Sequence, residues 1–124
     1  MDFKCTYLDS AIINDLLDLE SQGAKGVIKR QVERFKNDYK NYLDQIEAAI
    51  KEHNFENLRH HTHKLNGFAG VIGAAKIREK SLLLEKKAIE KDDSDLLSLF
   101  SELREVINPS LTELDQVVGV AAKS

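Results

Sequence analysis

The sequence of 124 residues has little of several residue types, and each shortage argues against a class of protein. Its single cysteine, Cys5, excludes an internal disulfide and makes a reducing compartment the expected environment. One proline, six glycines and no tryptophan argue against a turn-rich β fold. No apolar run approaches the roughly 20 residues that span a membrane, and the first residues lack the basic-then-apolar pattern of a secretion signal. We therefore expect a cytoplasmic protein without a membrane segment.

The residues that are abundant are typical of a helical globular protein. Hydrophobic residues make up 42% of the chain and charged residues 31%. The formal net charge of −3 argues against a nucleic-acid partner, because domains that bind nucleic acids usually carry a basic face. The length suits one hydrophobic core. We expect a single domain that spans residues 1–124.

Apolar residues recur at steps of three and four along most of the chain, which is the spacing of helices that bury one face. The pattern predicts four long helices, over residues 27–51, 55–72, 74–90 and from 96 onward. A shorter helix is predicted after Asp9, whose carboxylate can accept hydrogen bonds from the first free amides. Pro109 is expected to kink or split the last helix, and residues 119–124 are expected to fray. These elements predict an all-α fold, an antiparallel up-and-down four-helix bundle with a short extra N-terminal helix.

The helix at 55–72 carries a histidine on the side away from its apolar residues. At about 100° per residue, its core-facing residues fall within roughly 40° of one line; they are Leu58, Thr62, Leu65, Ala69 and Ile72. On the same wheel His63 lies roughly 140° from that line, Gly70 about 120° and Gly67 about 180°. Each glycine inside a helix costs about 1 kcal/mol relative to alanine, and packing against the core explains neither one. We therefore expect His63 to project into solvent beside two positions that have no side chain.

From Thr62 to Gly73 the sequence resembles the signature of histidine-containing phosphotransfer (HPt) domains. The matching positions are His63, Leu65, Gly67, Ala69 and Gly73. The resemblance extends over nearly the whole chain, through Leu8–Asp9, Phe35, Asn54–Phe55 and Leu84–Glu85. One position departs from the signature, because Asn66 stands where the family usually has a lysine.

The resemblance implies a phosphorelay intermediate that accepts a phosphoryl group on His63 and donates it onward. A neutral exposed imidazole has a nucleophilic lone pair, but a convex helix cannot by itself align and stabilise a moving phosphoryl group. The resemblance therefore implies receiver domains of response regulators and hybrid sensor kinases as partners, which bring the aspartate and its Mg²⁺. We expect a monomeric phosphoryl carrier with no cofactor of its own, and not a self-sufficient enzyme.

Several residues near His63 are candidates for supporting the transfer. Arg59, one turn earlier, is the expected cation for the phosphoryl oxygens. Asn66 is expected to support the same oxygens through its amide hydrogens, without a charge, and Lys80 or Lys87 on the next helix could compensate for the missing lysine. The expected docking surface for the partner consists of His60, Lys64, Gly67 and Gly70.

Two other functions remain open at this point. The bundle could dock a receiver or another helical protein without phosphoryl transfer, with Asn66 as a sign of lost activity. It could also bind a metal through His60 and His63, but only Glu56 lies nearby on that face and no cysteine completes a set, so we expect no metal site. The glycines also have a structural alternative, since a neighbouring helix could approach closely there.

Overall fold

The computed structural model describes residues 5–123, which contain five α-helices and no strand. Their bounds are α1 Ser10–Ser21, α2 Val27–Lys51, α3 Phe55–Val71, α4 Ala75–Ile89 and α5 Leu96–Ala122. Each long helix begins and ends within a residue or so of the position that the apolar periodicity predicts. The sequence pattern therefore locates the helices well, because every one of them buries a continuous stripe.

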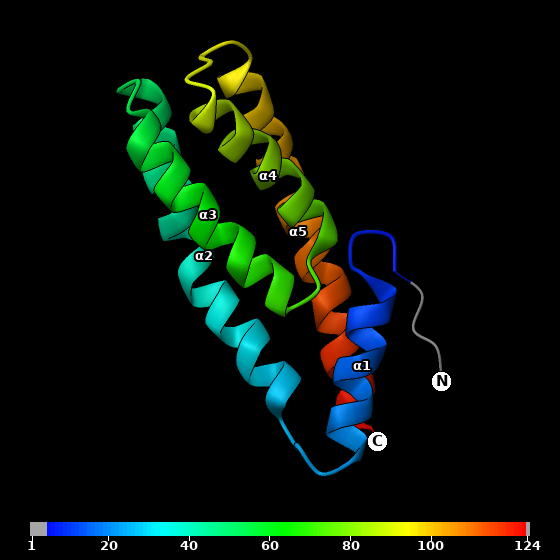
Figure 1. Ribbon diagram of the computed structural model, residues 1–124. Coiled ribbons are helices and arrows are strands. Elements are labelled where there is room, and N and C mark those ends of the chain that lie inside the picture. The colour runs from blue at the N-terminus through cyan, green and yellow to red at the C-terminus, as the bar shows by residue number, and fades with distance from the viewer. Residues whose placement is uncertain (1–4, 124) are drawn as a thin grey trace.

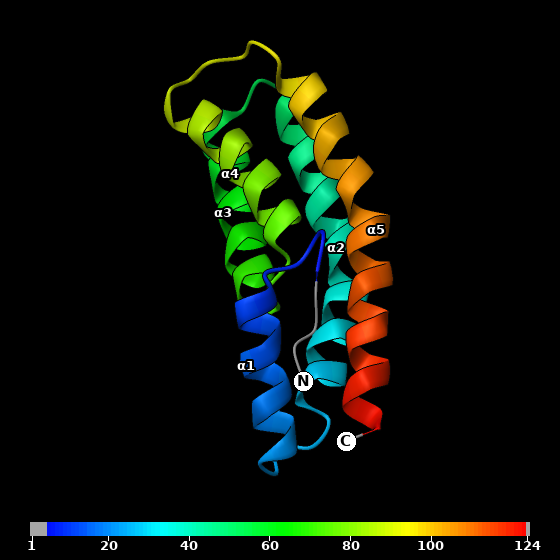
Figure 2. The same ribbon diagram turned by 90° about the vertical axis from the view of Figure 1, so that its right-hand side faces the viewer.

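Successive helices run in opposite directions, and α2 to α5 form an up-and-down bundle (Figure 1). The α3–α4 hairpin covers one half of the two long helices α2 and α5. Helix α1 lies along the other half, where it contacts α2 and α5 (Figure 2). The predicted all-α bundle with a short extra N-terminal helix is confirmed.

The core follows the stripes that the sequence predicts. The side chains of α2 that face the bundle are buried, namely Ile28, Val32, Phe35, Ile46 and Ile50. Phe68 of α3 packs at the edge of this core, with its ring 5.4 Å from that of Phe35. The core-facing residues of α3 are all buried, so the orientation of this helix in the bundle is fixed by its apolar face.

Helix α1 is joined to the turn between α3 and α4. The Asp9 carboxylate accepts hydrogen bonds from the amides of Ala11 and Ile12, which confirms the predicted cap. The amide of Asp9 donates to the carbonyl of Gly73 at 2.7 Å. Gly73 ends the α3 segment with φ at +70°, and a Cβ there would lie 3.1 Å from Ile12. Glycine is required here by both the backbone conformation and the close approach of α1.

The buried Glu20 at the end of α1 caps the start of α2. Its carboxylate accepts hydrogen bonds from the Ile28 amide at 2.9 Å and the Gly26 amide at 3.0 Å. The Ile28 hydrogen bond is the largest cause that lowers the pKa of Glu20, and it outweighs the desolvation that opposes it. A charge from one helix thus satisfies the free amides of the next.

The expectation that Pro109 splits the last helix is wrong. The helix is not split at Pro109 but continues without interruption from Leu96 to Ala122. The buried side chains of Ile107 and Leu114 on either side hold it against the bundle, and this packing outweighs the loss of one backbone hydrogen bond. Residues 119–122 are helical rather than frayed, since Val117 is buried just before them; residue 124 lies outside the described residues. None of the helices within residues 5–123 has the length and apolarity that crossing a membrane requires.

Candidate functional site

His63 lies on the solvent-facing side of α3, and 75% of its side chain is exposed. Thr62, the residue before it, and Leu65, two residues after it, are fully buried. The exposed ring is therefore anchored on a helix whose opposite face is fixed in the core. The predicted orientation of His63 is confirmed.

One edge of the imidazole is held by a carboxylate from α4. The Nδ1 atom of His63 lies 2.9 Å from Oε2 of Glu85, whose side chain is only 13% exposed. Because an ionised carboxylate only accepts hydrogen bonds, the Nδ1 atom carries the proton in this contact. The lone pair of the neutral ring then resides on Nε2, the nitrogen that Glu85 does not engage.

Asn66 is buried, and it contacts Glu85 from the side opposite His63. Its Nδ2 atom donates to Oε1 of Glu85 at 2.8 Å, and its Oδ1 atom accepts from the hydroxyl of Ser81. Only 6% of the Asn66 residue is exposed. We expected the amide hydrogens of Asn66 to support the phosphoryl oxygens; in the structure the amide nitrogen instead faces Glu85, because α4 packs over that side of α3.

The two glycines near His63 differ in what surrounds them. A Cβ at Gly67 would meet no atom within 4 Å among the described residues, so no neighbouring helix requires glycine there. A Cβ at Gly70 would lie 3.7 Å from Nε of Arg78, which is ordinary van der Waals contact. The structural alternative of a close helix approach is therefore wrong for Gly67, and at Gly70 the neighbour is a flexible side chain.

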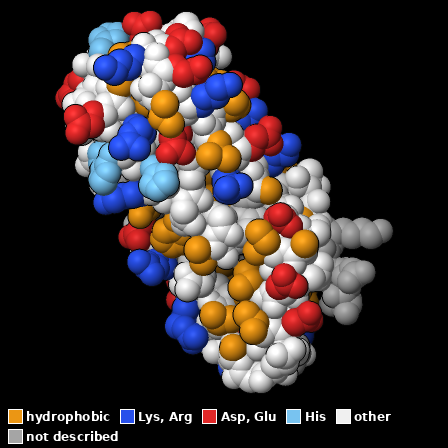
Figure 3. Space-filling model, in the orientation of Figure 1, with side chains coloured by type: hydrophobic (Ala, Val, Ile, Leu, Met, Phe, Trp, Pro, Cys, Tyr) orange, Lys and Arg blue, Asp and Glu red, His pale blue; other side chains and the backbone are white. Residues whose placement is uncertain are grey.

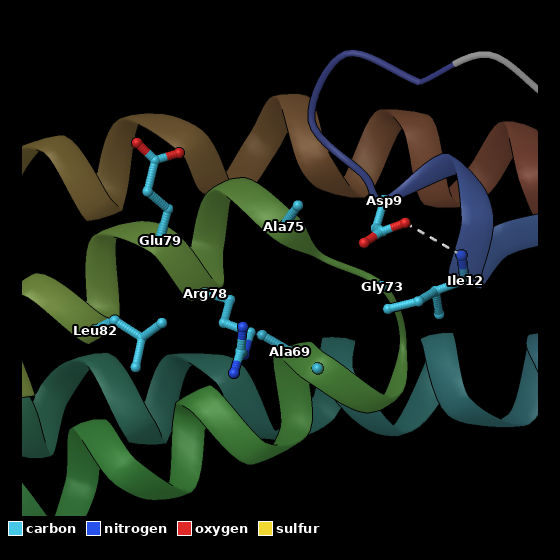
Figure 4. Close-up of a pocket in the computed structure, with 9 residues that line it drawn as sticks. Asp9, Ile12, Ala69, Gly73, Ala75, Arg78, Glu79 and Leu82 are labelled. Carbon is cyan, nitrogen blue, oxygen red and sulfur yellow. Dashed lines mark hydrogen bonds between the residues drawn. The ribbon is translucent and has the colours of Figure 1, made fainter.

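A shallow depression extends from His63 along the groove between α3 and α4. It is bordered by exposed apolar side chains of Val71 and Leu82. Its lining consists of His63, Asn66, Gly67, Gly70, Val71, Arg78, Leu82 and Glu85. A second hollow lies toward the start of α1, and there the Arg78 side chain points from α4 toward α3 near Ala69 (Figure 4). The depression places an exposed imidazole beside a surface of mixed apolar and cationic character.

Comparisons with known proteins agree with this geometry. A family model for the Hpt domain matches residues 31–117. The chain belongs to the Hpt domain family. It therefore has the role of this family, histidine phosphotransfer in phosphorelays, and Hpt proteins as a class are phosphoryl carriers that interact with the receiver domains of response regulators.

Two solved structures share the fold of this Hpt domain at low sequence identity. One is histidine-containing phosphotransfer protein B (HptB) from Pseudomonas aeruginosa PAO1, with a TM-score of 0.80, 18% identity and coverage of 91% of this chain and 95% of that chain. The other is the histidine-containing phosphotransfer protein ZmHP2 from maize, with a TM-score of 0.82, 15% identity and coverage of 94% and 86%. The comparison with curated proteins gives no significant match.

The cations that the sequence suggested for this Hpt domain do not all lie at the depression. Arg59 and Lys64 are exposed on α3, and neither forms an ion pair within residues 5–123. Lys80 instead pairs with Glu102 at 3.2 Å, and Lys87 pairs with Asp92 at 3.0 Å. The expectation that either lysine would compensate beside His63 is therefore not supported, because both are engaged elsewhere.

The other histidines are separate from the Glu85 contact. His60 is exposed, and its ring lies 5.1 Å from that of the half-buried His61. Burial is the largest cause that lowers the pKa of His61, followed by the neighbouring His60 and Lys64. Figure 3 shows histidine side chains beside Lys and Arg side chains on this part of the surface. Within residues 5–123 no group of three or more His, Cys, Asp or Glu side chains could hold a metal.

Three residues of this site were not predicted from the sequence, namely Ser81, Glu85 and Arg78. All three lie on α4, and they approach α3 in antiparallel register: Glu85 opposite His63, Ser81 opposite Asn66 and Arg78 opposite Gly70. Their spacing of three and four residues was a usable signal, since it places them along the side of α4 that faces α3. The partner helix of the hairpin has to be known before the pairs can be assigned.

Proposed function

We propose that His63 is the phosphoacceptor of this Hpt domain and that Nε2 is the reacting atom. The observation that carries the proposal is an imidazole that is 75% exposed while its Nδ1 atom is held 2.9 Å from Glu85. When Nδ1 carries the proton and donates it to the Glu85 carboxylate, the lone pair of the neutral ring is on Nε2. The contact orients the ring without covering Nε2. A nucleophile that a neighbouring group holds by a hydrogen bond needs this arrangement.

The proposed step exchanges one phosphoryl bond for another. The Nε2 lone pair attacks the phosphorus of an aspartyl phosphate on the partner, the N–P bond forms, and the P–O bond to the aspartate breaks. The bond electrons leave with the aspartate, which regains its carboxylate charge. The ring becomes positively charged with its proton still on Nδ1, and the Glu85 carboxylate stabilises that charge. Donation onward to another aspartate is the reverse sequence.

The charge of the moving phosphoryl oxygens needs cations that this chain supplies only in part. Arg59 lies one turn before His63 on the same helix, and the Arg78 side chain lines the depression beside it. We propose that these two guanidinium groups support the phosphoryl oxygens in place of Asn66, which is directed inward. The Mg²⁺ that the reaction uses belongs to the partner, and this chain binds no cofactor of its own.

The partners that we propose are receiver domains of response regulators and hybrid sensor kinases. The docking surface comprises the exposed residues His60, Lys64 and Gly67 around His63, together with the half-buried Gly70. We further propose that the protein is a monomer, because the apolar stripes of the long helices are already used in one core. We place this monomer in the cytoplasm, where its single cysteine would stay reduced. No nucleic acid is needed for this function.

The decisive experiment incubates the protein with a receiver domain that carries labelled phosphate on its aspartate. Transfer to His63 produces label on the Hpt domain that is lost in acid and kept in base. His63→Gln should abolish this label, whereas His53→Gln should keep it; His53 is the matched control because it is an exposed histidine outside the docking surface. Equal labelling of His63→Gln and the unmodified protein would refute the assignment.

A docking module without phosphoryl transfer is the second candidate, since a shallow depression with exposed Val71 and Leu82 suits protein binding without chemistry. Such a module would bind the receiver domain and never acquire label. The same experiment separates the two functions when binding is measured in parallel. Binding without label in the unmodified protein would favour the docking module.

A further inference from the structure

Four polar side chains form one connected path from the interior of the α3–α4 hairpin to the exposed imidazole. The Ser81 hydroxyl donates to Oδ1 of Asn66, Nδ2 of Asn66 donates to Oε1 of Glu85, and Oε2 of Glu85 accepts from Nδ1 of His63. The path alternates between α4 and α3 at each step. Exposure rises along it, from the fully buried Ser81 to the largely exposed His63.

The direction of the path is fixed by the chemistry of Glu85. An ionised carboxylate only accepts hydrogen bonds, so Glu85 has to face the amide nitrogen of Asn66, and the amide oxygen is then turned toward the Ser81 hydroxyl. If the amide were turned over, its oxygen would face the Glu85 carboxylate and its nitrogen would face the hydroxyl. That would place two acceptors against each other and lose the hydrogen bond to Glu85, although the hydroxyl oxygen could still accept from the amide nitrogen.

The amide therefore determines where the carboxylate lies. Each oxygen of Glu85 has one partner from this path, since Asn66 holds Oε1 and His63 holds Oε2. A carboxylate without the first contact could rotate about its last side-chain bond and leave Nδ1 of the imidazole. No buried side-chain nitrogen or oxygen among the described residues lacks a partner, so the path is complete as it stands.

We propose that Asn66 is a positioning residue that keeps the Glu85 carboxylate on Nδ1 and thereby keeps the lone pair of His63 on Nε2. The inference depends on the proposed function, in which Nε2 is the reacting atom. It gives Asn66 a role in orienting the nucleophile through Glu85, without contact with the phosphoryl group. Ser81 acts one step earlier by holding the amide oxygen of Asn66 with its hydroxyl.

The test measures the ring nitrogens of His63 by NMR and the rate of phosphoryl transfer in the same variants. In the unmodified protein, the neutral ring should carry its proton on Nδ1 only. Asn66→Leu keeps the side-chain size but removes both hydrogen bonds, so the ring should become a mixture of the two tautomers. Transfer should slow about tenfold, which is the lower end of the effect seen when a partner that orients a metal-ligating histidine is lost.

Asn57→Leu is the matched control, because Asn57 is an exposed asparagine on the same helix. It should change neither the tautomer nor the rate. Ser81→Ala removes one hydroxyl from the path and is the second variant, which decides the question if Asn66→Leu does not fold. It should also produce a tautomer mixture, with a smaller loss of rate.

An unchanged single tautomer in both variants would overturn the inference, as would a tautomer mixture with an unchanged transfer rate. Failure of the proposed function has a different signature. In that case His63→Gln would still acquire label, and no variant of the path would alter the rate, whatever the ring nitrogens show.

Discussion

At Gly67, the effect of a substitution on stability can be separated from its effect on docking of the partner. A side chain there would meet nothing within 4 Å among the described residues, and a helical glycine costs about 1 kcal/mol relative to alanine. Gly67→Ala should therefore raise the free energy of unfolding by about 1 kcal/mol. It should also slow transfer from a phosphorylated receiver, and the larger Gly67→Gln should slow it further, because both intrude on the docking surface.

Chemical denaturation and transfer rates measure the two effects. Gly119→Ala is the control, since Gly119 is also a helical glycine with open space around it, but on α5. It should stabilise the protein without changing the rate. Unchanged transfer in Gly67→Gln would show that the partner does not approach α3 at this position.

Arg78 is the residue whose charge we expect to replace the missing lysine. Arg78→Ala should slow transfer about fivefold, which corresponds to the loss of about 1 kcal/mol from an exposed charge-assisted contact. Arg78→Lys should keep most of the rate because the charge remains. Transfer kinetics under single-turnover conditions measure this, with Arg104→Ala on α5 as the control; a rate unaffected by Arg78→Ala would leave Arg59 as the supporting cation.

The contrast between His63 and Asn66 shows what the sequence could predict at this scale. His63 lies far from the apolar line of its helix, so one helical wheel was sufficient to predict its exposure. Asn66 lies closer to that line, and its burial depends on how α4 packs against α3. A wheel drawn for one helix contains no information about the neighbouring helix, and for the same reason Glu85 was matched to the family but given no role.

At the scale of the elements, the turn after α3 is where glycine is structurally required. Gly73 has φ at +70°, and a Cβ there would lie 3.1 Å from the Ile12 side chain. Gly73→Ala should therefore lower the free energy of unfolding by roughly 1–2 kcal/mol, because alanine is strained in this conformation. Thermal unfolding measures the loss. A stabilisation, as expected at Gly67, would contradict the proposed junction between α1 and this turn.

The cap between α1 and α2 gives a stability effect that depends on pH. Glu20→Gln should cost about 1–2 kcal/mol at neutral pH, because it removes a charged acceptor from two backbone amides. The Ile28 hydrogen bond lowers the pKa of Glu20 in the folded protein below its ordinary value of 4.5. The contribution is therefore present above that ordinary value and is lost as the pH falls through the lowered folded pKa.

Urea unfolding of both proteins across acidic pH tests the cap. The difference between their free energies of unfolding should shrink as Glu20 becomes protonated. Glu33→Gln is the matched control because Glu33 is an exposed glutamate on α2, and it should have little effect at any pH. A Glu20→Gln difference that stays constant down to the most acidic point would contradict the role of the charge.

Element positions were predictable to the extent that they depend on local pattern. The stripes of α2, α3 and α4 and the Asp9 cap are local, and the structure agrees with them. The unbroken α5 was not predictable, because its continuity through Pro109 depends on packing against other helices. The Glu20 cap was missed for a related reason, since it links the end of one helix to the start of the next across a loop.

At the scale of the whole molecule, the proposed reaction site and the N-terminal helix α1 lie on different halves of the bundle. The depression beside His63 lies on the α3–α4 hairpin, which covers one half of α2 and α5, and α1 covers the other half (Figure 2). The match to the Hpt family model begins at residue 31, after α1. The contacts of α1 with Gly73 and α2 stabilise the turn between α3 and α4 and the start of α2.

The distribution of charge over the molecule gives the last prediction. The chain has a net charge of −3, yet Arg59 and Lys64 project from α3 near His63. A partner that presents a phosphorylated aspartate is anionic at its reacting centre, so these cations should speed its association. Lys64→Glu should slow association several-fold at low salt, and the difference should nearly vanish at about 1 M salt, where screening acts over roughly 3 Å. Lys40→Glu makes the same charge change in the groove between α2 and α5, so binding kinetics that respond equally to both substitutions would point to net charge instead of a surface around His63.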